Sequence, residues 1–320
     1  MDYPRLSVVL PCFNEADVLL ETYSRLVAAC EAVVGDSFEL VMVNDGSTDV
    51  TWEIIKGLVA KDDRVVGYSL SRNFGQQMAV HCGLDRCSGE RVLLIDADLQ
   101  DPPELLGPMM SKMDEGYDVV YGQRERRDGE SKLKLLRSAA FYRVMRNMTG
   151  DFKLPLDTGD FRLMSRRVVE AFKQMPEQQR FNRGLISWIG YKQAGLLYRR
   201  DPRRAGETKW NASQLIRLAI DAITGFSIEP LRFAIHMGLL SLMVSAGLSV
   251  YAIASWVAGY AVEGWTSLMA AIIFFGSIQL FVLGIIGEYV GRILIEAKRR
   301  PLYFVADAAR QSSKVSIAAE

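Results

Sequence analysis

The sequence predicts an α/β domain with a mainly parallel sheet, followed by two transmembrane helices. Over residues 1–160, short runs rich in β-branched residues alternate with amphipathic stretches. Later, two long segments lack Asp, Glu, Lys and Arg, from Phe233 to Val262 and from Gly264 to Gly287. Each exceeds the roughly 20 apolar residues that a bilayer core requires. The formal net charge is zero, so the composition gives no reason to expect nucleic-acid binding.

The amino-terminal part divides into strands and helices in turn. The predicted elements are a strand at 6–11, a helix at 15–33, a strand and turn at 38–47, a helix at 49–60, a strand at 64–70, a helix at 76–87, a strand at 91–96 and, after another helix, a strand at 118–123. Open α/β sheets bind ligands beyond the carboxyl ends of their strands. Polar residues collect at these ends, namely Asn14 and Glu15, Asp45, Arg72 and Asn73, and Asp96 and Asp98.

The fourth strand ends in an acidic pair, Asp96 and Asp98. Residues i and i+2 of an extended chain project to one side, so the two carboxylates should converge. Carboxylate oxygens suit Mg²⁺ or Mn²⁺, and Gln100 could add an amide oxygen. Such a pair is also common in turns, and its position at a strand end is what favours a metal site. We expect Asp101 to need no function, because Asp101-Pro102-Pro103-Glu104 fits a capped helix start.

Asp45, in "VNDGSTD", has two interpretations. Asp-Gly is a turn signal. A buried carboxylate at this place could also accept a hydrogen bond from the imide N–H of a nucleotide base. Both interpretations remain open from the residues alone.

Residues 231–295 predict a two-helix transmembrane hairpin, and a soluble hairpin of core helices is the alternative. The connection between the helices has no Lys or Arg, whereas Arg217 and Arg232 precede the first span and Arg292, Lys298, Arg299 and Arg300 follow the second. This distribution places both termini in the cytoplasm. Glu288 lies four residues before Arg292, so we expect an ion pair at the helix end.

Basic residues concentrate before the hairpin. Between Gly122 and Arg146 there are eight Lys or Arg against three acids, with apolar residues interleaved. The pattern predicts an interfacial helix at about 131–149, although solvated surface charge would look similar. Residues 211–230 predict a second, juxtamembrane amphipathic helix. Residues 296–320 would form a cytoplasmic tail, polar and mobile from Asp307 onward.

Several motifs occur in one order along nearly the whole chain: "VVLPCFNEADVL", "VNDGSTD", "SRNFGQQMAV", "DADLQDPPE", "DTGDFRLMSRR", "RRAGETKW" and, in the hairpin, "GEYVGR". They resemble the inverting, GT-A, family 2 polyprenyl-phosphate glycosyltransferases, which include GtrB-type bactoprenol glucosyltransferases and dolichol-phosphate mannose synthase. The resemblance implies a catalytic domain at 1–210, a nucleotide-sugar donor, Mg²⁺ or Mn²⁺, and a polyprenyl phosphate acceptor. It also implies a homotetramer in the bacterial inner membrane, with the catalytic domain in the cytoplasm.

The resemblance and the strand-end pattern together assign candidate roles. The nucleotide-sugar group is Pro11, Asn14, Glu15, Asp45, Arg72, Asn73 and Asp96. The metal group is Asp96, Asp98 and Gln100. The acceptor-phosphate group is Arg124, Arg137, Arg203 and Lys209, and the catalytic group is Asp98, Asp157 and Arg203. The chain departs from many relatives at Cys12-Phe13, where they have a tyrosine before the asparagine.

The resemblance favours UDP-glucose as the donor. UDP-aminoarabinose, UDP-galactose, UDP-N-acetylglucosamine and GDP-mannose remain open, because sugar selection depends on pocket contacts worth a few kcal/mol. A processive polysaccharide synthase is disfavoured, because "EQQRFNRGLISW" lacks the Q-x-x-R-W signature and two spans are too few for an export channel. A catalytically silent membrane protein that binds nucleotide sugar or lipid phosphate is the alternative of another class.

Overall fold

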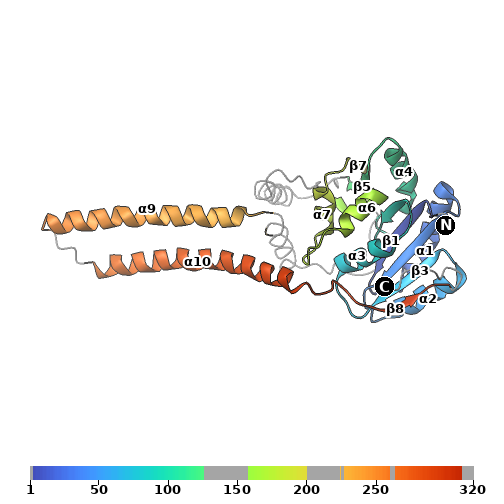
Figure 1. Ribbon diagram of the computed structural model, residues 1–320, viewed down its shortest axis with the longest axis horizontal. Helices are drawn as coiled ribbons and strands as arrows, with labels where there is room; N and C mark the ends of the chain where they lie inside the picture. The colour runs from blue at the N-terminus through green and yellow to red at the C-terminus, as the bar shows by residue number, and fades with distance from the viewer. Residues whose placement is uncertain (1–2, 126–157, 200–223, 225–226, 260–263, 312–320) are drawn as a thin grey trace. The chain divides into compact units, whose positions relative to one another are not determined.

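The computed structural model describes residues 3–125, 158–199, 224, 227–259 and 264–311 (Figure 1). These residues belong to two compact units. Residues 3–125, 158–199 and 300–311 form an α/β unit, and the described residues of 224–299 form a helical unit.

The described residues of the α/β unit form a sheet in the order β7-β5-β6-β4-β1-β2-β3-β8. Its strands are β1 (Leu6–Cys12), β2 (Phe38–Asn44), β3 (Val65–Leu70), β4 (Arg91–Leu94), β5 (Val119–Arg124), β6 (Thr158–Ser165), β7 (Gln193–Tyr198) and β8 (Val305–Ala309). The four neighbours β4, β1, β2 and β3 are parallel, which confirms the predicted class. Their carboxyl ends therefore meet at one edge. β6 and β8 run antiparallel to β4 and β3.

Helices pack on both faces of the sheet because the central strands are apolar on both sides. The helices are α1 (Leu19–Val34), α2 (Thr51–Lys61), α3 (Gln76–Arg86), the 3₁₀ turn η1 (Pro103–Leu105), α4 (Leu106–Asp114), α6 (Arg166–Lys173) and α7 (Asn182–Trp188). Leu6, Val8 and Leu10 of β1 share a core with α1, α2 and α4. Val9 points to the opposite face, where a Cβ on Gly83 of α3 would collide with its side chain. Glycine at this position lets α3 approach the sheet.

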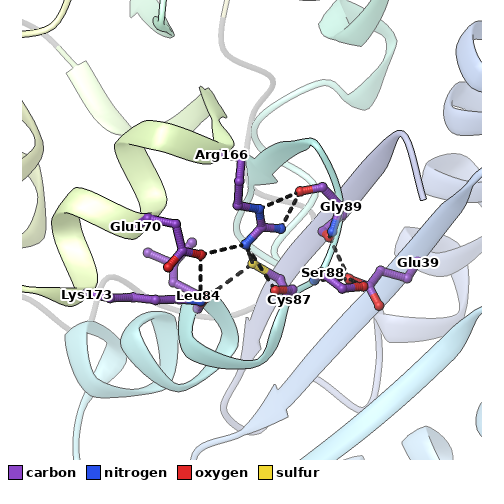
Figure 2. A network of polar contacts seen from close by, with 9 residues as sticks. Glu39, Leu84, Cys87, Ser88, Gly89, Arg166, Glu170 and Lys173 are labelled. Atoms are coloured by element: carbon purple, nitrogen blue, oxygen red, sulfur yellow. Dashed lines mark hydrogen bonds and ion pairs between the residues drawn. The ribbon is translucent and has the colours of Figure 1, made fainter. Parts of the chain in front are cut away.

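A polar network fastens the loop before β4 at the amino edge of the sheet (Figure 2). Arg166 Nε donates to the carbonyl of Gly89 at 2.8 Å, and its Nη1 donates to that of Cys87 at 3.1 Å. Glu39 of β2 accepts from the N–H and hydroxyl of Ser88 at 2.5 and 2.9 Å. Burial raises the pKa of the Cys87 thiol to about 11, so this cysteine stays protonated. This edge is therefore structural.

The chain after the hairpin returns to the sheet and forms β8. Ser69 of β3 pairs with Asp307, and Trp52 Nε1 donates to Asp307 Oδ2 at 3.1 Å. The expectation of a mobile chain from Asp307 is therefore wrong for residues 307–309. The segment Val305–Ala309 is short and contains three alanines, so its sequence does not predict a strand, but β3 offers it an unpaired edge.

The helical unit consists of α9 (Glu229–Val257) and α10 (Trp265–Lys298). Both are long and apolar enough to cross a membrane, and within the described chain neither apolar window is buried. This exposure favours lipid-facing helices over the soluble core alternative. Phe233 and Phe281 meet edge to face at 6.4 Å, and the Tyr289 hydroxyl donates to the Ser227 carbonyl at 2.7 Å.

The ion pair expected at the end of the second apolar helix is confirmed. Arg292 Nη2 lies 3.0 Å from Glu288 Oε1, one helical turn apart on α10. Glu288 therefore has a structural explanation at this helix end.

Candidate active site

The site residues of the first strand lie in the loop that follows β1. Pro11 is buried within the strand and pairs with Val43 of β2. Asn14 takes the left-handed conformation, with φ of 54°, and its Oδ1 accepts the N–H of Thr48 at 2.8 Å. The N–H of Glu15 donates to Thr51 Oγ1 at 3.0 Å. Asn14 and Glu15 therefore join the loop after β1 to the loop after β2 and to the start of α2.

The Asp45 carboxylate holds the loop between β3 and α3. It is 2% exposed, and its two oxygens accept the N–H groups of Phe74 at 2.7 Å and Gly75 at 2.9 Å. The neighbouring Gly46 has φ of 63°, and a Cβ there would collide with the backbone of Arg72. Burial raises the pKa of Asp45, while the two loop N–H groups and then Arg72 act in the opposite direction. We call residues 71–75 the β3–α3 loop.

Two exposed residues of the β3–α3 loop present polar groups to solvent. Arg72 Nη1 donates to the Asn73 carbonyl at 2.9 Å, and its guanidinium lies 3.9 Å from the Phe74 ring centroid. A guanidinium stacked on an aromatic ring is restricted in orientation and keeps donors available at its edges. The orientation of the Phe74 ring therefore helps to set where Arg72 points.

The acidic pair follows β4 in a strained turn. Gln76 Nε2 donates to Asp96 Oδ1 at 2.7 Å, and the N–H of Gln100 donates to Asp98 Oδ1 at 3.2 Å. Between Asp98 and Gln100, the buried Leu99 has φ of 59°, a conformation that costs a non-glycine residue about 1–3 kcal/mol. Strain of this kind persists where the surrounding structure fixes the backbone. Both aspartates remain partly exposed at the carboxyl edge.

The acidic pair fits a Mg²⁺ or Mn²⁺ ion that shares its ligands with a substrate. Within residues 3–125, 158–199, 224, 227–259 and 264–311, no three His, Cys, Asp or Glu side chains are grouped as a complete metal site. Mg²⁺ is commonly bound by one or two carboxylates together with waters and substrate phosphates. Asp96 and Asp98 supply that number of carboxylates, and Gln100 lies beside them.

Asp101 is not a helix cap. The 3₁₀ turn that follows has Pro102 as its N-cap residue and no side-chain cap, and Asp101 is 1% exposed. The Tyr198 hydroxyl donates to Asp101 Oδ1, across 97 residues of sequence. Burial would lower the pKa of Arg124, but the Tyr198 hydroxyl and then the carboxylates of Asp101 and Asp96 raise it. Arg124 is thus a cation held beside the acidic loop.

Comparison with known proteins decides the family. Residues 7–172 match the glycosyl transferase family 2 domain, and residues 229–293 match the GtrB C-terminal hairpin. The chain belongs to glycosyl transferase family 2. It is 44% identical to an uncharacterized glycosyltransferase of Bacillus subtilis, covering 93% of this chain and 92% of that protein. It is 39% identical to a prophage bactoprenol glucosyl transferase homolog of Escherichia coli, covering 94% and 98%.

Among the solved structures to which this chain is similar is that of S. aureus TarS residues 1–349 in complex with UDP-GlcNAc. The TM-score is 0.47 at 19% identity, covering 69% of this chain and 65% of that one. The two family matches, together with the sheet order described above, make this protein a family 2 glycosyltransferase with a GT-A-like α/β fold and two apolar carboxyl-terminal helices.

Four candidate residues of this family 2 enzyme lie outside the described residues: Asp157, Arg137, Arg203 and Lys209. The two predicted amphipathic segments, at about 131–149 and at 211–230, lie there too, apart from residue 224 and residues 227–230. Their roles stay predictions.

The structure adds residues that the sequence did not single out. Gln76 contacts Asp96, and the next residue, Gln77, donates through Nε2 to Asp160 Oδ2 at 3.3 Å. Asp160 also lies 3.5 Å from Arg183 Nε. These residues stand within or near conspicuous motifs such as "SRNFGQQMAV", but no local spacing distinguishes them from ordinary helix and strand residues.

Proposed function

We propose that this family 2 enzyme transfers glucose from UDP-glucose to a polyprenyl phosphate and releases UDP. The supporting observation is that one chain combines a family 2 domain with a GtrB-type hairpin. Relatives named bactoprenol glucosyl transferase, from Escherichia coli and Shigella phage SfV, are 39% identical over 94% of this chain. The apolar hairpin suits an acceptor that is itself held in a membrane.

The donor nucleotide would bind at the carboxyl edge of β1, β2 and β3. In this proposal, the exposed Arg72 and Asn73 face the nucleotide, and Asn14, Glu15 and Pro11 shape the other side of its pocket. Asp45 would accept the imide N–H of the base with a lone pair not used by the two loop N–H groups, since each carboxylate oxygen has two. Asp45 would then bind the base and also hold the β3–α3 loop in place through its two backbone hydrogen bonds.

Asp96, Asp98 and Gln100 would hold Mg²⁺ or Mn²⁺ on the donor diphosphate. Such an ion supplies neutralisation of the negative charge that develops on the leaving nucleotide. Gln76 fixes the orientation of the Asp96 carboxylate, and the N–H of Gln100 fixes that of Asp98. The protein therefore presents both carboxylates in set orientations.

The acceptor phosphate is anionic at neutral pH, so the reaction needs little help from a general base. One of its oxygens forms a bond to the anomeric carbon while the bond from that carbon to the UDP oxygen breaks, with the electron pair leaving on the diphosphate. Arg124 would bind the acceptor phosphate together with Arg137, Arg203 and Lys209, through charge-assisted hydrogen bonds. Asp157 would position the sugar or the acceptor. A single displacement inverts the anomeric centre.

The proposal places the enzyme in the bacterial inner membrane as a homotetramer, with the 231–295 hairpin crossing the bilayer. Arginine and lysine flank the hairpin and are absent from its connection, which supports cytoplasmic termini. The segments at about 131–149 and 211–230 would then lie at the cytoplasmic interface and the catalytic domain, residues 1–210, beneath it.

The test is incubation of the purified protein with undecaprenyl phosphate, Mn²⁺ and a panel of radiolabelled nucleotide sugars. We expect labelled lipid from UDP-glucose, and NMR of that lipid should show a β linkage from the α-linked donor. Label from another sugar instead would refute the donor assignment. An α linkage would refute single displacement, a labelled polymer would indicate a synthase, and no product would indicate a silent binding protein.

A further inference from the structure

The chain that follows α10 forms the edge strand β8 and contacts the β3–α3 loop beside it. We call residues 301–311 the C-terminal strap. We propose that the strap positions the β3–α3 loop for donor binding and that Phe304 is the positioning residue. The proposal rests on the donor site proposed above.

The strap extends the sheet pairing of β3 into the loop. Leu70, the last residue of β3, pairs with Val305 of β8. The N–H of Ser71, the first loop residue, donates to the Phe304 carbonyl at 2.9 Å. The rings of Phe304 and Phe74 then approach with their centroids 6.5 Å apart and their planes tilted by 51°. The strap thus holds the loop at its backbone and at its aromatic side chain.

The strap is also attached to α3, the element at the other end of the loop. The Tyr303 hydroxyl donates to Asp85 Oδ2 at 2.8 Å and accepts from Arg86 Nη1 at 2.6 Å. Its ring meets that of His81 edge to face at 6.1 Å. Because Tyr303 is fixed on α3 and β8 is paired with β3, Phe304 sits between two anchors. Its ring therefore has a defined place beside the loop.

The contact chain from Phe304 ends at a side chain of the proposed donor site. Phe304 touches Phe74, and the Arg72 guanidinium stacks on the same Phe74 ring at 3.9 Å. Phe304 is 56% exposed, so its ring contributes little to the core. Removing the Phe304 ring should release Phe74 and Arg72 and let the loop open more often, while the two Asp45 hydrogen bonds keep the closed loop as its main state and the protein stays folded.

The strap is joined to the second apolar helix by a short connection. Residues 299 and 300 alone separate the last residue of α10, Lys298, from Pro301. A helix proposed to anchor the enzyme in the membrane is therefore continuous in sequence with the segment that holds the donor loop. In the proposed enzyme, the strap therefore connects the helix that would lie in the same bilayer as the acceptor to the loop that would bind the donor.

The test compares Phe304→Ala with Phe304→Tyr in the full-length protein. An aromatic contact of this kind corresponds to about a two- to tenfold change in affinity. We expect Phe304→Ala to raise KM for UDP-glucose and the Kd for UDP by that factor, with kcat within about twofold. Phe304→Tyr keeps the ring and should restore both constants. Tyr3→Ala removes a ring that is 70% exposed in the same unit and serves as the matched control.

Hydrogen–deuterium exchange supplies the readout that does not depend on catalysis. Phe304→Ala should accelerate exchange in peptides covering residues 71–75 and leave peptides of β1 unchanged. Unchanged exchange in the loop would overturn the proposal, and so would an unchanged Kd for UDP or an equal effect in Tyr3→Ala. If the unaltered protein transfers no glucose, the proposed function fails, while loop exchange and UDP binding still decide the role of the strap.

Discussion

Replacing Asp45 with asparagine tests whether its carboxylate holds the β3–α3 loop. The carboxylate accepts two backbone N–H groups, from Phe74 and Gly75, in a position that is 2% exposed. Asparagine has nearly the same shape but offers one oxygen and one NH₂ group. One loop N–H keeps its acceptor, and the other faces a group that can only donate.

The expected loss follows from these contacts. A hydrogen bond to a charged group contributes about 1.5–3 kcal/mol, and a buried donor left without an acceptor costs about 1–3 kcal/mol. Burial raises the pKa of Asp45, so the buried charge is itself unfavourable, and the neutral asparagine recovers part of the loss. We therefore expect Asp45→Asn to lower the free energy of unfolding by about 1–2 kcal/mol.

Asp49→Asn provides the matched control. Asp49 accepts the N–H groups of Thr51 at 3.0 Å and Ala16 at 3.3 Å, but its side chain is exposed, so water can replace the lost acceptor. Asp49→Asn should lower the free energy of unfolding by about 0.5 kcal/mol or less. Urea denaturation of the detergent-solubilised full-length protein, followed by tryptophan fluorescence, measures both variants. Equal losses in Asp45→Asn and Asp49→Asn would refute the role given to burial at Asp45.

Three further predictions concern pH, a buried hydroxyl and the metal. Burial lowers the pKa of His81 from its usual 6.5 to about 4, so the folded protein binds this proton less readily than the unfolded chain. The free energy of unfolding should therefore fall as pH drops from about 6.5 toward 4, by at most about 1.4 kcal/mol per pH unit. His81→Gln should make the urea midpoint less dependent on pH over this range, and an unchanged pH profile of urea midpoints would contradict the prediction. Tyr198→Phe removes a buried hydrogen bond to Asp101 and should cost about 1–3 kcal/mol. Tyr23→Phe removes a hydrogen bond to Asp62 that is only partly buried, and it should cost about 1 kcal/mol or less. Equal costs would argue against the role given to the Tyr198 contact. Asp98→Asn should lower Mn²⁺-dependent transfer about 100-fold or more with an unchanged melting temperature, and full activity after chelation would exclude a metal role.

The sequence predicted the parallel half of the sheet because each of its elements carries its own apolar pattern. β1 to β4, with their intervening helices, lie within a few residues of their expected positions. The antiparallel strands gave no such signal. β6 has Asp160 and Arg162 at buried positions, and β8 is five residues long. Their pairing depends on neighbours distant in sequence, which local periodicity does not encode.

For the candidate site, the sequence predicted which residues lie at the strand ends but not the side chains that contact them. Strand ends indicated Asp45, Asp96 and Asp98, because parallel strands deliver their carboxyl ends to one edge. The partners of these residues come from elsewhere in the chain, as with Gln76, which lies 20 residues from Asp96. Asp101 was misread as a cap because the local sequence fits one, whereas its structural partner is 97 residues away.

The central claim is that sugar leaves its nucleotide at the acidic loop after β4. A crystal structure of the full-length protein with Mn²⁺ and UDP-glucose tests it most directly. We predict the ion on the carboxylates of Asp96 and Asp98, and the donor diphosphate bound to that ion at the carboxyl edge of the sheet. An ion and diphosphate bound at any other place on the chain would contradict the account.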